Sequence, residues 1–328
     1  MKKVIYSGLL ILFLLSVSSC NKTSTLPTVE PTAFDISSFQ VIPPKVTDKD
    51  YLAFDDTKIN FGIYLDQPED IRNTNMVPDI IGWYDDWESK ATSKQKMDLI
   101  GIEHVAIPMI TWMPVDISLE EIVNGKYDEY IKGYIRRLAI NCPENDILIR
   151  FAHEMEYRPT YQETWYSWQE DKDPELFIKA WRHVIELGRT YNSNIKWIWS
   201  PNRSDEYSAA YYPGDDYVDY VGLTLNLPET DAPKYKTFGD FYVKEGTKEH
   251  IEKYNKKIII CEVAYSNKNQ QEKQAYLKSI FDYAASDENI AAILFFNTDV
   301  SEIQQYRISD NDQYMNLINE EIRKIRNE

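Results

Sequence analysis

The sequence has few of the residue types that build metal, nucleotide or serine-hydrolase sites. It contains only 4 histidines in 328 residues, and His104, His183 and His250 stand isolated, so no metal-binding cluster is expected. His153 precedes a glutamate, but the second histidine that a zinc protease needs four residues later is Tyr157. The glycines form neither a phosphate-binding loop after a predicted strand nor a G-x-S-x-G elbow. The sequence therefore indicates no metal and no cofactor.

Basic residues and cysteines are also scarce. Against 53 acidic residues there are 36 basic ones, and the resulting net charge of −17 would repel a phosphate backbone. Nucleic acid is therefore not expected as a partner. The chain has 3 cysteines, and a domain of this length can build its core without disulfides. Aromatic residues make up 13% of the chain, which suits either a core or flat surfaces for sugar rings.

The N-terminal segment has the pattern of an export signal. Two lysines precede a short apolar run and several small residues, which end directly before Cys20. We interpret residues 1–19 as the signal peptide of a bacterial lipoprotein and Cys20 as its lipidated residue, the alternative being an ordinary signal peptide. Residues 20–50 contain Ser, Thr and four prolines and read as a flexible tether. We expect an exported, membrane-anchored protein, and the pattern leaves the membrane face open.

Residues 51–328 show eight alternations of short apolar runs and helical patterns. A closed (β/α)₈ barrel, or TIM barrel, forming a single domain has this size and rhythm, and a doubly wound open sheet is the alternative. The helical stripes are weak after the first, fifth and sixth strands, whereas Asp173 and Pro174 mark a clear helix start. The predicted strands are Ile59–Leu65, Ile80–Tyr84, His104–Thr111, Ile147–Ala152, Ile195–Ser200, Tyr217–Leu223, Lys257–Val263 and Ala291–Phe296.

Two glutamates follow predicted strands four and seven, at the barrel end where active sites lie. Glu154 and Glu262 would face one cavity, and paired carboxyl groups are what glycoside hydrolysis requires. Strand alternation places Arg150 on the same face as Glu154. A buried arginine there needs a counter-ion, and Glu262 at the end of strand seven would supply it. That contact would keep Glu262 ionised as a nucleophile, while Glu154 remains protonated as the acid. A purely structural ion pair is the competing interpretation.

Five motifs in this chain occur together and in order. The chain carries ITWMP (110–114), RFAHEM (150–155), WSPN (199–202), YYPGDDYVDYVG (211–222) and IIICEV (258–263), and with them it resembles glycoside hydrolase family 26. The resemblance implies a retaining (β/α)₈ glycosidase with Glu154 as acid/base and Glu262 as nucleophile. It also implies that Arg150 and His153 shape the subsite of the cleaved sugar.

The chain departs from the family pattern in three places. The family continues HEM with Asn-Gly, whereas Met155 here precedes Glu156; after strand six the family has a Tyr that contacts the nucleophile, whereas this chain reads Leu223-Thr224-Leu225-Asn226. In strand eight, Phe295 stands where the family has a sugar-stacking Trp. The predicted substrate-binding residues are Arg150, His153, Trp112, Trp165, Trp168, Trp199, Asn202 and Phe295.

Two functions stay open. The first is a monomeric retaining glycosidase acting on a β-linked polysaccharide, with β-1,4-mannan as the family's commonest substrate and β-1,3-1,4-glucan or β-1,3-xylan as alternatives. The second is a non-catalytic glycan-binding lipoprotein on the same barrel, whose missing strand-six Tyr marks lost turnover. The presence of both glutamates, of Arg150 and of His153 favours the enzyme.

Overall fold

A computed structural model describes residues 53–66, 70–71, 74–87, 106–142, 145–156, 166–169, 172–191, 194–244 and 247–327. The predicted signal peptide, Cys20, the tether and Trp165 lie outside these residues. Within the described part of the chain, no helix combines the length and the apolar character needed to cross a membrane.

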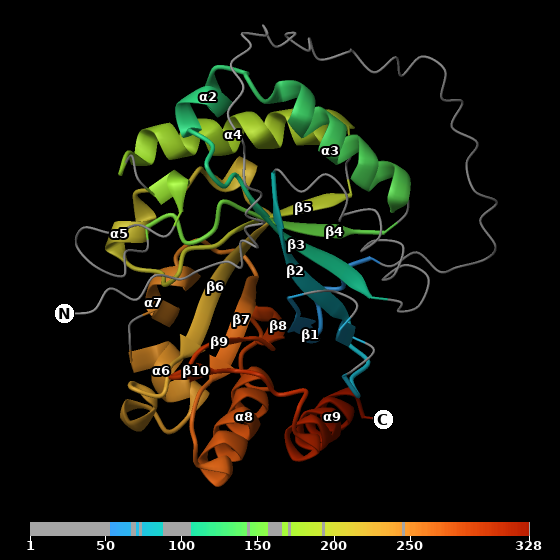
Figure 1. Ribbon diagram of the computed structural model, residues 1–328, viewed down its shortest axis with the longest axis vertical. Coiled ribbons are helices and arrows are strands. Elements are labelled where there is room, and N and C mark those ends of the chain that lie inside the picture. The colour runs from blue at the N-terminus through green and yellow to red at the C-terminus, as the bar shows by residue number, and fades with distance from the viewer. Residues whose placement is uncertain are drawn as a thin grey trace, which may run out of the picture. The chain divides into compact units, whose positions relative to one another are not determined.

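Parallel strands of the described chain form a closed barrel, in which each strand pairs with the next and β8 pairs with β1 (Figure 1). Closure rules out the open sheet and confirms the predicted (β/α)₈ barrel. The strand ends agree with the sequence prediction to within a few residues. The strands are β1 (Asn60–Tyr64), β2 (Ile80–Asp86), β3 (Ile107–Met113), β4 (Ile147–Phe151), β5 (Ile195–Trp199), β6 (Tyr220–Leu227), β7 (Ile258–Tyr265) and β8 (Ile290–Phe296).

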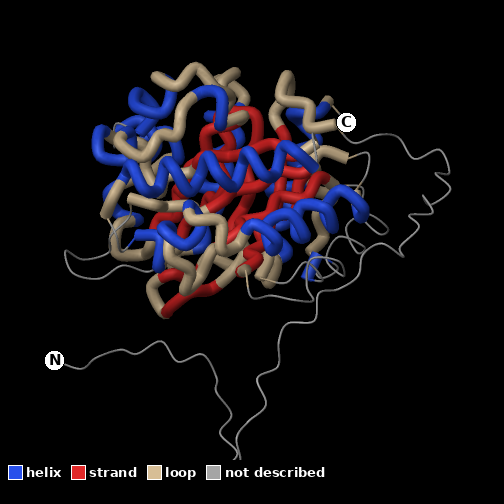
Figure 2. Tube along the Cα trace, turned by 90° about the horizontal axis from the view of Figure 1, so that it is seen from above, coloured by secondary structure: helices blue, strands red, loops and turns tan. Residues whose placement is uncertain are grey.

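Helices surround the barrel on its outside (Figure 2). The longest, α4, begins at Pro174, where the carboxylate of Asp173 accepts bonds from two backbone N–H groups, as the sequence predicts. Among the described residues, the connection after β1 contains no α-helix, and those after β5 and β6 contain only short ones, in agreement with their weak helical patterns. The helices are α2 (Leu119–Val123), α3 (Asp128–Asn141), α4 (Pro174–Tyr191), α5 (Glu206–Ala209), α6 (Phe238–Lys244), α7 (Thr247–Glu252), α8 (Gln270–Ala284) and α9 (Asp312–Arg326).

Short 3₁₀ turns and a small hairpin complete the described connections. The turns are η3 (Ser167–Gln169), η4 (Asp215–Tyr217) and η5 (Ala232–Lys234), and the hairpin consists of β9 (Asp299–Ser301) and β10 (Gln304–Gln305). The turn η3 follows β4 and reaches the site described below.

Alternation along the strands divides the apolar side chains into two layers. One set, including Met109, Leu148 and Ile198, fills the interior of the barrel. The larger set packs between the strands and the surrounding helices, and includes Ile149 of β4 and Trp181 of α4. Because neighbouring residues on a strand belong to different layers, the position of a residue in the alternation decides whether it can reach the barrel interior.

Candidate active site

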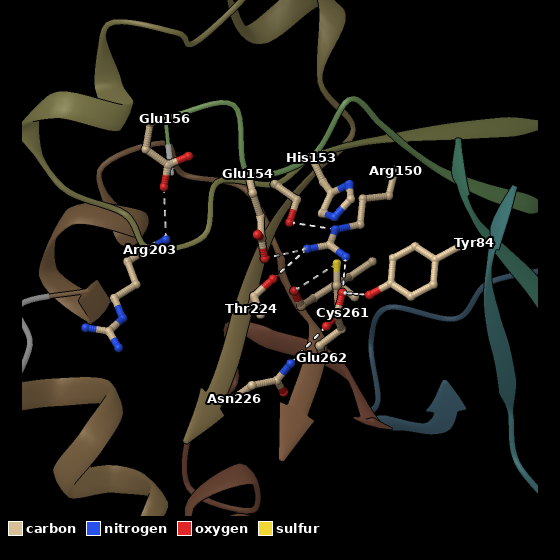
Figure 3. A network of polar contacts seen from close by, with 12 residues as sticks. Tyr84, Arg150, His153, Glu154, Glu156, Arg203, Thr224, Asn226, Cys261 and Glu262 are labelled. Atoms are coloured by element: carbon tan, nitrogen blue, oxygen red, sulfur yellow. Dashed lines mark hydrogen bonds and ion pairs between the residues drawn. The ribbon is translucent and has the colours of Figure 1, made fainter. Parts of the chain in front are cut away.

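A buried arginine stands at the centre of the site. Arg150 of β4 has no solvent exposure, and its guanidinium points into the barrel interior (Figure 3). Its Nε donates to Oγ of Ser200 at 2.9 Å, its Nη2 donates to Oγ1 of Thr224 at 2.6 Å, and its Nη1 donates to Oε1 of Glu262 at 2.5 Å. Nη2 also lies 3.9 Å from Oε1 of Glu154. One guanidinium therefore contacts both carboxyl groups that the sequence singles out.

Glu154 reaches this arginine by a strained turn rather than by strand alternation. The strand β4 ends at Phe151, and both Ala152 and Glu154 adopt positive φ angles, of 42° and 53°. Such angles are costly for residues other than glycine, so the surroundings must hold them in place. Glu154 therefore lies near Arg150, as the sequence predicts, but the prediction that strand alternation brings it there is wrong.

The strained turn is held by hydrogen bonds to its backbone. The N–H of Glu154 donates to the carbonyl of Ser200 at 2.8 Å. From η3, the indole N–H of Trp168 donates to the carbonyl of His153 at 2.8 Å, and the amide of Gln169 donates to the carbonyl of Glu154 at 2.7 Å. Both η3 side chains are buried, so these bonds are shielded from water.

A β-bulge turns Glu262 into the barrel. Cys261 belongs to the apolar interior, so simple alternation would direct Glu262 outward to the helices. The pairing between β6 and β7 shifts at this point, from Leu223 opposite Ile260 to Thr224 opposite Glu262. The extra residue in β7 re-aims the carboxylate inward, as bulges near active sites do.

Three side chains from three strands hold the carboxylate of Glu262. Oε1 accepts from Arg150 and also from the hydroxyl of Tyr84 on β2, at 2.8 Å. Oε2 accepts from the amide nitrogen of Asn226 on β6, at 2.9 Å (Figure 3). The carboxylate is buried with an exposed fraction of 3%, so these partners replace most of its hydration.

The two carboxyl groups have different environments. Burial and the negative charge of Glu262 raise the pKa of Glu154, and the charge of Arg150 together with the bonds from Thr224 and Asn202 offsets this rise only in part. Burial opposes the charge on Arg150, but the nearby carboxylates raise its pKa overall, so it stays cationic. Glu262 pairs directly with that cation, whereas Glu154 lies further from it. The arrangement therefore favours one protonated acid and one carboxylate.

Two further titratable groups lie next to this pair. Burial and the charge of Arg150 lower the pKa of His153 well below its usual value, so its imidazole is neutral. Burial raises the pKa of Glu156 to about 8. Oε1 of Glu156 accepts from the backbone N–H of Arg203 at 3.1 Å, which ties the segment after β4 to the segment after β5. The described residues contain no group of three or more acidic, His or Cys side chains that could hold a metal ion.

Three of the predicted sugar-binding aromatics are in the wrong layer. Trp112, Trp199 and Phe295 have exposed fractions of 1% or less and belong to the layer between strands and helices. Trp112 stacks on Tyr134 of α3 at 4.5 Å, and Phe295 packs against Phe281 of α8 at 5.6 Å. Each follows or precedes an inward residue on its strand, so alternation directs it outward. The prediction that these three bind sugar is wrong.

Of the other predicted substrate-binding residues, those that the structure describes lie near Glu154 and Glu262. Trp168 is 1% exposed and stacks on the half-buried Tyr166 with ring centroids 4.3 Å apart, so it presents no open face to a sugar. Trp168 is therefore corrected from a sugar platform to a support for the His153–Glu154 turn. Asn202 contacts Glu154 as described above, and His153 packs 5.1 Å from Tyr166.

Sequence reasoning missed three polar residues of this site. Tyr84, Thr224 and Asn226 all contact Arg150 or Glu262. Their signal was available in the alternation, because Thr224 and Asn226 follow Gly222 at intervals of two on β6. The strand prediction ended at Leu223, and this early end hid both residues.

The described strands form a (β/α)₈ barrel, and inside it lie two paired carboxyl groups of the kind that glycoside hydrolysis requires. Residues 107–243 match the sequence model of Glycosyl hydrolase family 26, which confirms the family resemblance predicted from the motifs.

Curated relatives match parts of the chain. Endoglucanase H of Acetivibrio thermocellus is 28% identical over 174 residues, or 48% of this chain and 18% of that protein. Mannan endo-1,4-beta-mannosidase of Bacillus subtilis is 30% identical over 88 residues, or 24% of this chain and 22% of that protein. The matched parts thus span less than a quarter of the length of these two relatives.

Among solved structures, the chain resembles the catalytic domain of an endo-beta-1,4-mannanase from Bacillus sp. JAMB-750. The TM-score is 0.63 at 14% identity, and the match covers 82% of this chain and 86% of that one. This similarity confirms the barrel fold.

Proposed function

We propose that the protein is a retaining glycoside hydrolase, with Glu154 as acid/base and Glu262 as nucleophile. The observation that carries the proposal is the shared arginine: Nη1 of Arg150 lies 2.5 Å from Glu262 and Nη2 lies 3.9 Å from Glu154, with all three side chains buried. A structural ion pair needs one carboxylate. A second buried glutamate on a strained turn costs stability, and such strain accumulates at functional sites.

In the first step, an oxygen of Glu262 attacks the anomeric carbon of the bound sugar. The bond from that carbon to the leaving oxygen breaks, and Glu154 transfers its proton to that oxygen. A glycosyl ester on Glu262 results. In the second step, the carboxylate of Glu154 takes a proton from water, the water oxygen attacks the anomeric carbon, and the ester bond breaks to restore Glu262.

The charge of Glu262 lets Glu154 exchange its two roles. In the free protein this charge helps to raise the pKa of Glu154, which keeps the acid protonated. When Glu262 becomes an ester, its negative charge is gone while Arg150 remains cationic. The pKa of Glu154 then falls, and its carboxylate becomes available as the base of the second step.

For the substrate we propose a β-linked polysaccharide, with β-1,4-mannan ahead of β-1,3-1,4-glucan and β-1,3-xylan. The names of the relatives support this class, since they include a mannosidase and an endoglucanase. The test is a panel of these polysaccharides with a reducing-end assay, followed by NMR of the first product. We expect hydrolysis of at least one polymer with the β-configuration retained. Binding without hydrolysis would support the non-catalytic glycan-binding protein instead.

We also propose that the protein is an exported lipoprotein anchored to a bacterial membrane through Cys20. The small residues directly before this cysteine support the proposal. Replacing Cys20 with Ala should release the protein from the membrane fraction of the expressing cells. A variant that still sediments with membranes would contradict the lipid anchor.

A further inference from the structure

Tyr84 contacts Glu262, the proposed nucleophile, and the family resemblance offers no counterpart for this tyrosine. It stands on β2, and its hydroxyl donates to Oε1 of Glu262 on β7 at 2.8 Å. The residues are 178 positions apart in the chain, and barrel closure alone brings them together. The family's tyrosine contact to the nucleophile arises from strand six, and in this chain that segment instead supplies Asn226.

The surroundings fix the direction of the Tyr84 hydroxyl. The ring lies against Tyr64 of β1, with centroids 4.6 Å apart, and its centroid lies 5.9 Å from that of His153. Gly82 makes room for this packing, because a Cβ at that position would lie 2.6 Å from the ring of Tyr64. Rings packed in this way leave the side chain little freedom to turn away from Glu262.

The same hydroxyl keeps its proton. Burial, and then the charge of Glu262, raise the pKa of Tyr84 well above its usual value. Tyr84 therefore stays a hydrogen-bond donor to Glu262 at neutral pH. A neutral donor stabilises a carboxylate without adding a second positive charge beside Arg150.

The donors on Glu262 are divided unequally between its two oxygens. Oε1 accepts from Arg150 and Tyr84, whereas Oε2 accepts only from Asn226 among the described residues. An oxygen that accepts two strong bonds, one of them from a cation, is the weaker nucleophile. The carboxylate is thus held from one side, and its other oxygen is left as the better attacking group.

We propose, on the basis of the proposed function, that Tyr84 is a positioning residue for the nucleophile. Tyr84 holds Oε1 of Glu262, so that Oε2 attacks the anomeric carbon. Tyr84 thereby supplies from β2 the contact that a strand-six tyrosine would otherwise make from the opposite side of the barrel. With Tyr84 in this role, the missing strand-six tyrosine no longer indicates a protein without turnover.

The test compares two Tyr→Phe variants on dinitrophenyl β-glycosides of mannobiose and cellobiose. Tyr84→Phe removes the hydroxyl that bonds Glu262. Tyr276→Phe is the matched control, because Tyr276 on α8 is fully buried and its hydroxyl has no partner among the described residues. Both variants keep the aromatic ring, so both should fold.

We expect Tyr84→Phe to lower kcat by about 10- to 100-fold with little change in KM, the loss expected for one bond to a charged group. The acidic limb of its kcat/KM profile should move to higher pH, since a carboxylate that loses a donor takes up a proton more readily. Tyr276→Phe should match the wild type in both readouts.

Equal kcat and an unmoved acidic limb in Tyr84→Phe would overturn the proposal. A raised KM at unchanged kcat would also overturn it, because Tyr84 would then be a sugar contact instead. A wild-type protein that hydrolyses none of the glycosides and polysaccharides would overturn the proposed function, and this inference with it. The wild-type rate therefore tests the function, and the ratio of variant to wild type tests the role of Tyr84.

Discussion

Arg150 and Glu262 form an ion pair of 2.5 Å inside the barrel, although 112 residues separate them in the chain. The guanidinium is fully buried and uses its three nitrogens on Ser200, Thr224 and Glu262. A guanidinium can bond all three acceptors at once because its planar group presents several donors in fixed directions, which the ammonium of a lysine does not.

Replacing Arg150 with Met should therefore abolish activity and destabilise the protein by about 3–5 kcal/mol, because it leaves a buried carboxylate without its partner. Arg150→Lys should keep part of the stability but still lose most activity, since one ammonium cannot reach all three acceptors. Urea unfolding and the aryl glycoside assay measure both effects. Arg136→Met, an exposed change on α3, is the control; it removes only a cation–π contact with Tyr191, so it should cost at most about 1 kcal/mol and leave activity unchanged. An active Arg150→Met variant would refute the role of this arginine.

The contribution of Glu156 to stability should fall as the pH rises from about 4.5 to 8. Its pKa is about 8 in the folded protein against 4.5 as the reference value, so the folded state binds more protons in this window. Glu156→Gln mimics the protonated side chain and keeps an acceptor for the N–H of Arg203. One pKa unit corresponds to about 1.4 kcal/mol, so the variant should melt several degrees above the wild type at pH 8.

At pH 5 the Glu156→Gln variant and the wild type should melt at nearly the same temperature. Glu320→Gln, an exposed change on α9, should follow the wild type at both pH values. Parallel melting curves of Glu156→Gln and wild type across this range would show that Glu156 ionises normally in the folded protein.

Gly222 of β6 should tolerate no side chain. A Cβ there would lie 2.7 Å from Cγ2 of Ile198, 2.8 Å from Sγ of Cys261 and 2.9 Å from Cβ of Ser200. Gly222→Ala should destabilise the protein by about 1–3 kcal/mol through overpacking. It should also lower activity, because Ser200 bonds Arg150 and Cys261 precedes Glu262 at the bulge.

The matched control is Gly133→Ala on α3, where the added Cβ would meet only Nη1 of Arg137, at 3.6 Å. That change should stabilise the protein by about 0.5–1 kcal/mol, since alanine favours helix more than glycine. Thermal unfolding of the two variants checks both signs. A Gly222→Ala protein as stable and active as the wild type would contradict the close packing around the bulge.

The outward position of Trp199 leads to a prediction that separates core from sugar contact. Its ring packs edge-on against Tyr212 and Tyr254, each 5.1 Å away. Trp199→Phe should lower the free energy of unfolding by about 1–3 kcal/mol and leave KM for the polysaccharide unchanged. A raised KM at unchanged stability would restore the original interpretation of Trp199 as a sugar platform.

The sequence was sufficient for the barrel and for the central triad of Arg150, Glu154 and Glu262. Apolar runs of regular spacing mark buried strands, and a charged residue at the end of such a run stands out because burial is costly. The aromatics could not be assigned in the same way. A tryptophan near a strand end is suitable for the core or for sugar, and only the alternation of the folded strand decides between them.

Two local irregularities of the backbone could not be predicted from the sequence pattern either. The bulge at Cys261 reverses the side of Glu262, and positive φ angles at Ala152 and Glu154 redirect the chain after β4. Neither carries the glycine or asparagine that usually signals such geometry. Tertiary contacts impose both, including the bonds from Trp168 and Gln169, which appear only once the fold is known.

The most direct test of the account is the product that azide forms with the two glutamate variants on a dinitrophenyl β-glycoside. Glu154→Ala should still form the glycosyl ester, because this leaving group needs no proton, and azide should then release a β-glycosyl azide by attacking the ester on Glu262. Glu262→Ala should be inactive without azide and, if azide restores it, should give the α-anomer by a single displacement. A β-azide from Glu262→Ala, or an α-azide from Glu154→Ala, would contradict the assignment of the two glutamates.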